Sequence, residues 1–491
     1  MFDKILIANR GEIALRLIRT CRDLDIRTVA VYTPEDRDAL HVRMADECLS
    51  LTSPLGYRDG PRLLEAAQQT GSQAIHPGYG FLAEDALFAA ACAEAGIVFI
   101  GPPPALLARL QDKIGTLRHV AAAGYATPQA SDKAAGLDEG TRLEQQAAAL
   151  GFPLVIKSCR GGRGRGMRLV FQPDSFGEQV RQARREAENV YGDSSLYLER
   201  AIAPARHLAV QIAGDAQGHL IHLGERDGSL QHNSQKLFEE SPAPHLDDGQ
   251  RARLWETARQ IARLFDFQGV GTVEFLMDRG GTFYFTEIKP RIVQPHPVTE
   301  MVTRVDLVAL QIALAAGEPL RLRQEDIRLR GWAMQCRVSA EDPWNDYLPS
   351  PGMVRHYRVP GGAHIRIDSY ACAGCQVPVD YDPILAKLVV WGETRAVCLR
   401  RMRRALDEFV VRGVATNLTL LRQVIEHPDV VRGEYHTGLL FDPLPLPLVA
   451  EEVRRDLAAA TAVAFALREE SGQPSPPPRL LSGWHRASRA L

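Results

Sequence analysis

The first 110 residues alternate short apolar runs with amphipathic stretches. Residues 4–8 predict a buried strand, residues 11–24 a helix with one apolar face, and residues 28–32 a second strand. Further apolar segments begin at Ala74 and Val98, and each follows a helical stretch. Strands that alternate with helices in this way predict an open α/β domain with a mostly parallel sheet.

The hydrophobic pattern changes in the middle of the chain. A strand at 153–157 is followed by a Gly-rich loop, a helix at 174–189 and a strand at 196–199. Alternation between 208 and 300 predicts antiparallel strands, with one long helix at 246–265 between them. This second half of the pattern is typical of a mixed α/β domain.

These patterns divide the chain into four parts. Residues 1–113 form the N-terminal α/β domain, and residues 114–330 form a second domain whose mobile Gly-rich lid spans about 131–203. Residues 331–441 predict a C-terminal α+β domain. Residues 442–491 combine Pro-rich segments with a predicted helix, which is typical of a linker or docking tail.

Two glutamates lie symmetrically about a pair of glycines, with alternating apolar residues on both sides. A two-residue turn at Gly280-Gly281 pairs Glu274 with Glu287 on one face, with Cβ atoms roughly 5 Å apart. Like charges placed so are destabilising unless a cation lies between them, and Mg²⁺ prefers oxygen ligands and brings phosphates with it. The alternative is a solvated edge hairpin, in which paired acids cost little.

A lysine at the end of a predicted strand leads into a Gly-rich loop. Four glycines within six residues let backbone N–H groups approach phosphate oxygens, with Lys157 as a point charge. The loop is neither a Walker A motif nor a dinucleotide fingerprint, and a flexible surface loop is the alternative. Together with Lys113 and the acidic pair, it predicts a nucleoside triphosphate site. The glycines are Gly161, Gly162, Gly164 and Gly166.

Bulk composition excludes several classes of protein. Fifty-eight basic and 60 acidic residues give a formal charge of -2, which argues against a dedicated nucleic-acid or membrane surface. Eight dispersed cysteines form no disulfide framework, and the first residues lack a signal-peptide pattern. No apolar stretch reaches about 18 residues, the length that a membrane span needs. We therefore expect a protein of the reducing cytoplasm.

Short motifs follow one another through most of the chain, and their order is more specific than any one of them. They are Ile7-Ala-Asn-Arg-Gly-Glu-Ile-Ala14, His76-Pro-Gly-Tyr-Gly-Phe81, the Lys157 loop, Arg206-His207, Gln235-Lys236, Glu274, Glu287, Arg291, His296-Pro-Val-Thr-Glu300, Cys336-Arg-Val-Ser-Ala-Glu-Asp-Pro343 and Tyr381-Asp-Pro383. In this order they resemble biotin carboxylase, an ATP-grasp enzyme, from residue 1 to about residue 441.

The resemblance implies an ATP-grasp fold that holds ATP between two α/β lobes. In such a fold Lys113 and Lys157 contact the phosphates, and the Gly-rich loop closes as a lid. The resemblance also implies Glu199 and Ile202 at the adenine, His207 and Gln231 at the ribose, and Met167 and Leu276 as further nucleotide-binding residues.

The resemblance also implies the chemistry. In biotin carboxylases ATP phosphorylates bicarbonate, the carboxyphosphate decomposes, and the ureido nitrogen of biotin captures the CO₂. By this resemblance Glu274 and Glu287 hold magnesium, with manganese as an alternative. Lys236 and Arg291 hold bicarbonate, and Arg337 stabilises the biotin enolate.

The chain contains no Ala-Met-Lys-Met biotinylation site. A carboxylase of this kind receives its biotin on a separate carrier protein and works with a carboxyltransferase subunit. The resemblance implies a homodimer, and the tail from Pro443 is a candidate docking segment for a partner.

The resemblance fails at the bicarbonate end. The family reads Glu-Met-Asn-Thr-Arg-Ile-Gln-Val-Glu-His-Pro-Val-Thr-Glu, whereas this chain reads Glu-Ile-Lys-Pro-Arg-Ile-Val-Gln-Pro-His-Pro-Val-Thr-Glu. Pro295 stands where the family has the glutamate proposed to deprotonate bicarbonate, and proline has no titratable group. Val293 and Gln294 stand in reverse order, which sends the amide to the opposite face of an extended segment.

Two further substitutions lie nearer to the nucleotide. Lys289 replaces an asparagine beside the metal pair, where its ammonium takes over one metal position or pairs with Glu287. Ser234 replaces a histidine on the nucleotide side.

The altered residues leave three interpretations open. The first is ordinary biotin carboxylation with a replacement base, such as Glu300 or a water held by Lys289. The second keeps ATP and Mg²⁺ but activates another carboxylate or uses an acceptor other than biotin. The third is a weakly active or non-catalytic subunit of a carboxylase complex. Sequence drift in an inactive protein should change residues at both ends of the site, whereas here the ATP-side residues are largely retained.

Overall fold

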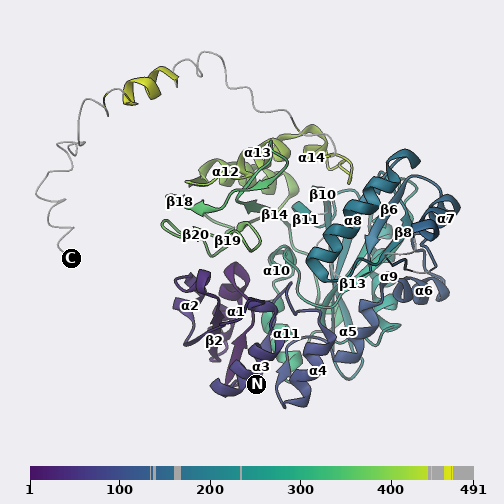
Figure 1. Cartoon of the computed structure of the whole chain (residues 1–491), viewed down its shortest axis with the longest axis horizontal. Helices are drawn as coiled ribbons and strands as arrows, with labels where there is room; N and C mark the ends of the chain where they lie inside the picture. Colours follow the sequence, from purple (N-terminus) through teal and green to yellow (C-terminus); the bar gives the residue numbers. More distant parts are fainter. Residues whose placement is uncertain are drawn as a thin grey trace, which may run out of the picture. The chain divides into compact units, whose positions relative to one another are not determined.

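Five parallel strands form the sheet of the N-terminal region, in the order β3-β2-β1-β4-β5. The strands are β1 Lys4–Ile7, β2 Arg27–Tyr32, β3 Glu47–Ser50, β4 Ala74–His76 and β5 Val98–Phe99. The helices are α1 Gly11–Asp23, α2 Leu40–Met44, α3 Gly60–Thr70, α4 Ala86–Glu94, α5 Pro104–Gln111 and α6 Lys113–Ala122. The predicted open parallel α/β region is confirmed (Figure 1).

The structure is a computed structural model that describes most of the chain. The described residues are 1–132, 134–136, 140–159, 167–232, 235–440, 444, 458–465 and 467. The four predicted phosphate-loop glycines, Ser234 and most of the tail lie outside the described residues. Residues 1–444 form one compact unit, and the following residues form a second one.

The segment predicted as the lid contains a three-stranded antiparallel sheet, in the order β7-β6-β8. Its elements are α7 Gly140–Leu150, β6 Leu154–Ser158, β7 Arg168–Val170, α8 Phe176–Tyr191 and β8 Leu196–Arg200. Apolar residues of both helices and of the sheet form a hydrophobic cluster of their own, which includes Leu143, Ile156 and Ala183. The strand, helix and strand predicted for this segment are confirmed in that order.

An eight-stranded antiparallel sheet forms the centre of the molecule, in the order β13-β12-β9-β10-β11-β14-β21-β19. Its strands are β9 Arg206–Gly214, β10 Leu220–His232, β11 Gln235–Ser241, β12 Gly269–Met277, β13 Phe283–Lys289, β14 Trp332–Ser339, β19 Ile365–Ser369 and β21 Ile384–Gly392. The strand β14 pairs directly with β11, so the sheet continues from the predicted ATP-grasp domain into the predicted C-terminal domain. The predicted long helix is α9 Asp248–Arg263.

Helices cover the part of this sheet that comes from the C-terminal region of the chain. They are α12 Arg395–Glu408, α13 Leu418–Glu426 and α14 Pro428–Arg432 (Figure 1), and α12 packs on β14 and β21. Short strands complete the region: β15 Glu341–Asp342, β16 Leu348–Pro349, β17 Gly352–Met353, β18 His356–Arg358, β20 Gln376–Val377 and β22 Val410–Arg412.

Two helices after β13 join the N-terminal region to the central sheet. They are α10 His296–Thr303 and α11 Leu307–Ala315. Ile13 and Leu17 of α1 belong to the same hydrophobic cluster as Leu307 and Ile312 of α11. This shared core fixes the N-terminal region beside the hairpin that carries the paired glutamates.

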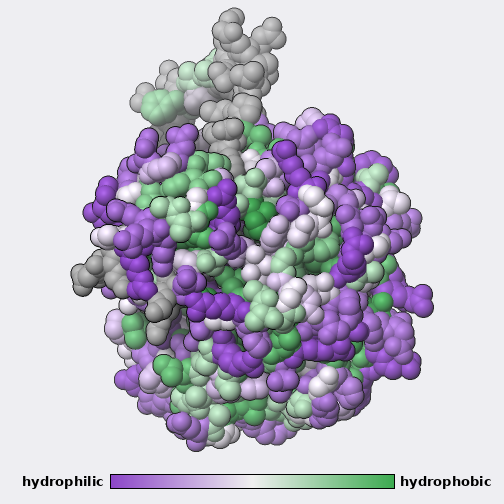
Figure 2. Space-filling view, turned by 90° about the vertical axis from the view of Figure 1, so that its right-hand side faces the viewer, coloured by the Kyte–Doolittle hydropathy of each residue, from purple (hydrophilic) through white to green (hydrophobic). Residues whose placement is uncertain are grey.

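Hydrophilic residues cover most of the face that Figure 2 shows, and hydrophobic residues occur there in small groups. Within the described ranges, no helix is long and apolar enough to cross a membrane.

Candidate active site

The paired glutamates face each other as predicted. The strands β12 and β13 are antiparallel neighbours, and Glu274 pairs directly with Glu287. The predicted two-residue turn at the glycines is wrong, because the loop between the strands spans residues 278–282. The correct pairing therefore needs a second irregularity that compensates for the longer loop.

A β-bulge provides this compensation. Next to the loop Phe275 pairs with Phe285, whereas one step further Glu274 pairs with Glu287, which leaves Thr286 as the extra residue. The Thr286 hydroxyl donates to the backbone oxygen of Glu274 at 3.0 Å. The bulge keeps Phe285 in the core while both carboxylates reach the same face of the sheet.

Three basic side chains surround the Glu274 carboxylate, which is only 2% exposed. Lys236 and Lys289 donate to its Oε1 at 3.0 and 2.8 Å, and His207 Nε2 lies 3.2 Å from its Oε2. Burial raises the pKa of Glu274, but the charges of the two lysines and the contact with His207 outweigh burial and hold the pKa well below its usual range. Glu274 is therefore an ionised, fixed centre of the site.

The Lys289 ammonium lies between the two glutamates. Its Nζ is 2.8 Å from Glu274 Oε1 and 3.5 Å from Glu287 Oε1. Burial lowers the pKa of Lys289, and the two facing carboxylates raise it by more, so the ammonium stays charged. For Glu287, burial raises the pKa, and Lys289 is the main charge that lowers it below its usual value. The lysine thus pairs with both acids.

Lys113 and Lys157 reach the site from different elements. Lys113 begins α6, and its Nζ donates to the backbone oxygen of Ser158 at 3.5 Å. Lys157 lies on β6 and donates to Glu199 at 2.7 Å. Burial lowers the pKa of Lys113; the charge of Glu287 opposes this effect and the charge of Lys157 adds to it. The predicted phosphate lysines are therefore close enough to the acidic hairpin to act on its charges.

The predicted adenine-side residues lie at the end of β8. Glu199 is 2% exposed, and besides Lys157 its carboxylate accepts a hydrogen bond from the Tyr197 hydroxyl at 3.0 Å. Ile202 lines a cavity of about 600 Å³ together with residues 127–129 and 278–280. The connection after β8 therefore lies next to the loop of the acidic hairpin.

Strand pairing brings further predicted nucleotide residues to the same face. His207 on β9 pairs with Leu276 on β12, and Gln231 on β10 pairs with Lys236 on β11. Met167 directly precedes β7. Burial lowers the pKa of His207, which leaves the imidazole neutral at neutral pH.

Lys236 and Arg291, predicted at the bicarbonate, are each held by a carboxylate. Besides its contact with the acidic hairpin, Lys236 lies 3.5 Å from Glu239. Arg291 is 12% exposed at its side chain and donates to Glu84 of the N-terminal region at 2.6 Å. The charge of Arg291 also opposes the rise in the pKa of Lys289, so the Arg291 guanidinium lies near the Lys289 ammonium.

The altered segment after β13 offers no carboxylate at the position of the family's base. Val293 is 5% exposed, and its backbone oxygen lies 2.8 Å from Nδ1 of His296. Pro295 is the N-cap of α10. His296 is fully buried, and burial together with nearby cations such as Lys387 holds its pKa well below its usual range. His296 is thus a neutral, packed residue.

Glu300, one candidate for a replacement base, has both carboxylate oxygens engaged. Its Oε1 accepts from Arg16 at 3.1 Å and from the backbone N–H of Leu307 at 2.8 Å. Its Oε2 accepts from Arg366 at 2.6 Å. A base needs a free oxygen that faces the substrate, so these contacts argue against Glu300 in that role. Its partners could not be found from the sequence, since Arg16 lies 284 positions away.

Arg337 lies next to the Tyr381-Asp-Pro383 motif in the structure. Its guanidinium is 7% exposed and donates to Asp382 at 2.7 Å and to the Ser339 hydroxyl at 3.2 Å. The neighbouring Tyr381 ring lies 4.5 Å from the guanidinium carbon of Arg10. Motifs from both ends of the chain thus meet at the predicted biotin side.

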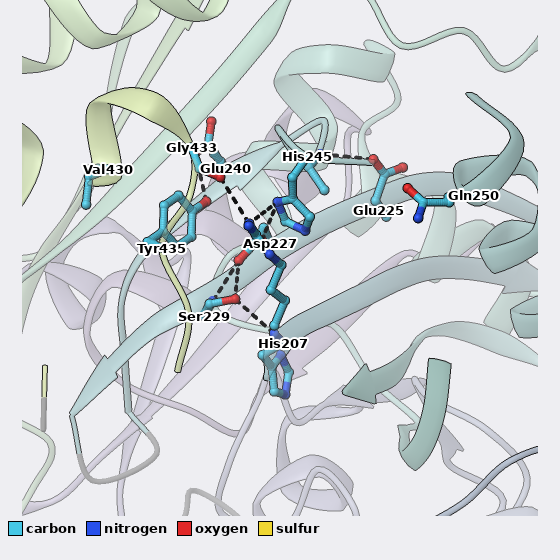
Figure 3. A network of polar contacts seen from close by, with 12 residues as sticks. His207, Glu225, Asp227, Ser229, Glu240, His245, Gln250, Val430, Gly433 and Tyr435 are labelled. Carbon is cyan, nitrogen blue, oxygen red and sulfur yellow. Dashed lines mark hydrogen bonds and ion pairs between the residues drawn. The ribbon is translucent and has the colours of Figure 1, made fainter. Parts of the chain in front are cut away.

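A buried polar network extends from His207 toward the C-terminal region (Figure 3). The Ser229 hydroxyl accepts from the backbone N–H of His207 at 2.9 Å and donates to Asp227 at 2.6 Å. Asp227 pairs across strands with Glu240, which accepts from the Tyr435 hydroxyl at 2.7 Å. This network could not be predicted from the sequence, because its segments lie far apart in the chain and belong to no local motif.

The fold and the site together define a class. The smaller antiparallel sheet carries Lys157, helix α6 carries Lys113, and the larger antiparallel sheet carries the carboxylate pair. ATP-grasp enzymes, which activate carboxylates with ATP, have this arrangement. Three family models match the chain: Biotin carboxylase, N-terminal domain, over residues 1–107; Carbamoyl-phosphate synthase L chain, ATP binding domain, over 112–323; and Biotin carboxylase C-terminal domain, over 335–442. The chain belongs to the biotin carboxylase family.

Curated relatives agree with this assignment. Biotin carboxylase of Nostoc sp. (strain PCC 7120) is 44% identical over 443 residues, which cover 89% of this chain and 98% of the relative. Biotin carboxylase 1 of Bacillus subtilis is 41% identical over 445 residues, which cover 90% and 98%.

Solved structures of biotin carboxylases have the same fold. The biotin carboxylase domain dimer of Hydrogenobacter thermophilus 2-oxoglutarate carboxylase, in complex with MgADP, ADP and bicarbonate, aligns with a TM-score of 0.86 at 40% identity and covers 91% of this chain and 100% of that one. Campylobacter jejuni biotin carboxylase in its β-γ-ATP complex aligns with a TM-score of 0.84 at 39% identity, covering 90% and 99%. The predicted ATP-grasp fold is confirmed.

Proposed function

We propose that this chain is an ATP- and Mg²⁺-dependent biotin carboxylase that activates bicarbonate and carboxylates biotin on a separate carrier protein. The observation that carries the proposal is the direct pairing of Glu274 with Glu287, within the electrostatic reach of Lys113. Of these facing carboxylates, Glu287 would hold a divalent ion, which in phosphoryl transfer neutralises the phosphate oxygens. Manganese is the alternative metal.

The metal-side residues fit a divalent ion. The Glu287 side chain is 39% exposed, and in the described part of the chain its one ion pair is the 3.5 Å contact with Lys289. Its oxygens are therefore available as ligands, whereas Glu274 is already surrounded by cations. When bound, magnesium supplies charge that stabilises the transferring phosphoryl group.

The nucleotide-side residues bind and orient ATP. Lys113 and Lys157 attract the phosphates. At the proposed ribose position, His207 contacts Glu274 of the acidic hairpin and Gln231 pairs across strands with Lys236. We propose domain limits at 113 and 330 and a lid at about 131–203, with ATP between this lid and the acidic hairpin.

The bicarbonate and biotin residues form the other end of the site. Lys236 and Arg291 hold the bicarbonate, and their carboxylate partners fix their positions. Arg337 contacts biotin and stabilises the enolate that forms when the ureido N–H gives its proton to the phosphate released from carboxyphosphate. The ureido nitrogen then attacks CO₂. Because Pro295 supplies no base, the bicarbonate proton passes to solvent, for instance to a water near Lys289.

One observation favours a second candidate function. With Pro295 at the base position and Glu300 held by Arg16 and Arg366, the site suits a substrate that arrives already ionised. A carboxylic acid at neutral pH needs no proton removal before its oxygen attacks the γ-phosphate of ATP. Activation of such an acid to an acyl phosphate is therefore the alternative to bicarbonate.

We also propose the assembly and location of the enzyme. A carrier protein and a carboxyltransferase complete the reaction, since relatives include the alpha chain of a propionyl-CoA carboxylase and a component of a pyruvate carboxylase. A homodimer is supported by the dimer named for the Hydrogenobacter thermophilus domain. All eight cysteines are free thiols, which fits the reducing cytoplasm.

ATP hydrolysis by the purified full-length chain tests the proposed function. We expect hydrolysis that requires bicarbonate and rises when free biotin is added, and that falls at least 100-fold in Glu287→Gln, which keeps the side-chain shape. Hydrolysis that ignores bicarbonate but responds to another carboxylic acid would favour the alternative. Nucleotide binding without any turnover would contradict both and indicate a non-catalytic subunit.

A further inference from the structure

We propose that the Lys289 ammonium takes the place of one divalent cation at the paired glutamates, so that the site binds a single Mg²⁺ together with its nucleotide. The proposal rests on the proposed function, because it concerns how the same site holds ATP. Of the two roles that the sequence leaves open for Lys289, a metal position or a pairing with Glu287, the contacts favour the first.

The geometry places the ammonium where a bridging metal would lie. Lys289 Nζ is 2.8 Å from Glu274 Oε1 and 3.5 Å from Glu287 Oε1, so it already spans the two carboxylates. A Mg²⁺ ion that bridged the same two oxygens would need contacts of about 2.0–2.1 Å in the same gap. The ammonium and a bridging ion therefore exclude each other, by volume and by like charge.

The oxygens of Glu274 are already committed. Oε1 accepts from both Lys236 at 3.0 Å and Lys289 at 2.8 Å, and Oε2 faces His207 Nε2 at 3.2 Å. A carboxylate oxygen accepts about two hydrogen bonds, so Oε1 has no further position for a metal. Glu274 thus acts as a fixed anion that orients two ammonium groups.

Glu287 keeps the opposite character. Its side chain is 39% exposed, compared with 3% for Glu274, and its contact with Lys289 is the longer of the two. In the described residues no second ion pair is present on Glu287. A nucleotide-bound divalent ion therefore finds one acidic ligand here, while the lysine neutralises the other acid.

The strand geometry fixes Lys289 in this position. It is the last residue of β13 and pairs with Thr272, two residues beyond the position where Glu287 pairs with Glu274. Residues two apart on a strand lie on the same face, so the pairing itself directs the Lys289 side chain toward both carboxylates. The ammonium is 22% exposed and is therefore held inside the site rather than on the outer surface.

Counting bound metal tests the proposal directly. Mn²⁺ serves as the probe, measured by electron paramagnetic resonance during titration of the full-length chain with a non-hydrolysable ATP analogue, while fluorescence of a labelled ADP measures nucleotide binding separately. We expect one Mn²⁺ per bound nucleotide in the wild type. In Lys289→Asn, which removes the ammonium and adds an oxygen ligand, we expect two.

Lys289→Arg is the matched control, because it keeps the charge, and we expect one Mn²⁺ in this variant. Two Mn²⁺ per nucleotide in the wild type would overturn the proposal, even if neither variant folds. A count of one in Lys289→Asn would overturn it as well. If the wild type bound no nucleotide in the fluorescence assay, this result would instead contradict the proposed function.

Discussion

Lys289, Val293 and Pro295 change the balance of charge at the carboxylate end of the site. Lys289 adds an ammonium that contacts both paired acids, at 2.8 and 3.5 Å. Val293 is buried, and Pro295 caps α10, so neither contributes a polar side chain to the substrate. The result is a pocket with fixed cations and no base at the usual place, in which the ionisation state of the substrate itself limits the reaction.

Restoring the two lost side chains tests this account. In the double variant Val293→Gln with Pro295→Glu, we expect bicarbonate-dependent ATP hydrolysis to rise about 100-fold, because a positioned general base contributes roughly 10²–10⁴-fold. Steady-state kinetics at saturating ATP measure the change. The control is Val293→Gln with Pro295→Gln, which has the same shape but cannot accept the proton and should stay near the wild-type rate. Equal gains in both variants would assign the effect to packing.

Glu300 is a structural acid in this account. Replacing it by alanine leaves Arg16 and Arg366 without their shared buried partner, and we expect the free energy of unfolding to fall by about 3 kcal/mol in urea denaturation. The midpoint of the pH dependence of kcat/KM should not move. A shifted midpoint together with wild-type stability would show that Glu300 is the base after all.

At the scale of elements, close contact between β10 and β11 positions Lys236. A Cβ atom on Gly228 would lie 2.9 and 3.0 Å from Cδ and Cε of Lys236 and 2.9 Å from Glu239 Oε1. The strand pair therefore requires a residue without a side chain at this point, so that the lysine can reach Glu274.

Gly228→Ala tests this positioning. The displaced atoms belong to flexible side chains, so we expect the thermal midpoint to change little. The value of kcat/KM for bicarbonate should fall roughly 10- to 100-fold, because a displacement of about 1 Å can cost that much. The control is Gly361→Ala, whose added Cβ has no atom within 4 Å and which should keep wild-type kinetics. Equal losses in both variants would contradict a specific effect on Lys236.

Local patterns predicted the two strands of the acidic hairpin, but neither the length of its loop nor its β-bulge. The alternation predicted both strands, and the predicted two-residue turn paired Glu274 with Glu287. The turn was mispredicted because the loop is longer than two residues. The Asp278 carboxylate stabilises this longer loop by accepting a hydrogen bond from the backbone N–H of Thr282 at 2.9 Å. The bulge at Thr286 has no sequence signal of its own. The pairing was right because these two irregularities, one residue each, cancel.

Contacts between distant segments could not be predicted from periodicity. The pairing of Phe238 with Cys336 joins two predicted domains in one sheet, yet both segments read as ordinary strands. The partners of Glu300 likewise come from α1 and β19. The motif order named the candidate site residues, whereas charge partners such as those of Glu300 could be found only in the three-dimensional structure.

At the scale of the whole molecule, a buried network connects the nucleotide side to the C-terminal region. Asp227 is fully buried, and burial raises its pKa to about 7 against the hydrogen bonds from Ser229. Arg206 and His245 lie beside it, and Arg206 donates to the backbone oxygen of Gly433 at 3.0 Å. The network therefore links β9 and β10 to the segment that follows α14.

This network predicts a pH-dependent stability. Between pH 4 and 7 the folded chain holds a proton on Asp227 that the unfolded chain, with an aspartate pKa of about 3.9, does not hold. The contribution of Asp227 to the free energy of unfolding therefore falls as pH rises through this range. In Asp227→Asn this fall is absent, so relative to the wild type the variant should gain about 2 kcal/mol between pH 5 and 8, measured by urea denaturation.

The exposed Asp174→Asn variant is the control and should follow the wild-type pH dependence. Parallel curves for the wild type and Asp227→Asn would contradict a protonated Asp227 and would mean that the neighbouring basic residues keep it ionised in the folded chain.

The fate of a labelled bicarbonate oxygen tests the central claim that this chain activates bicarbonate with ATP. If bicarbonate oxygen attacks the γ-phosphate, the phosphate released when carboxyphosphate loses CO₂ keeps that oxygen. With ¹⁸O-labelled bicarbonate, ATP, Mg²⁺ and biotin, we predict that mass spectrometry finds one ¹⁸O in the inorganic phosphate formed before the label exchanges with water. Phosphate that carries oxygen from water alone would contradict the account.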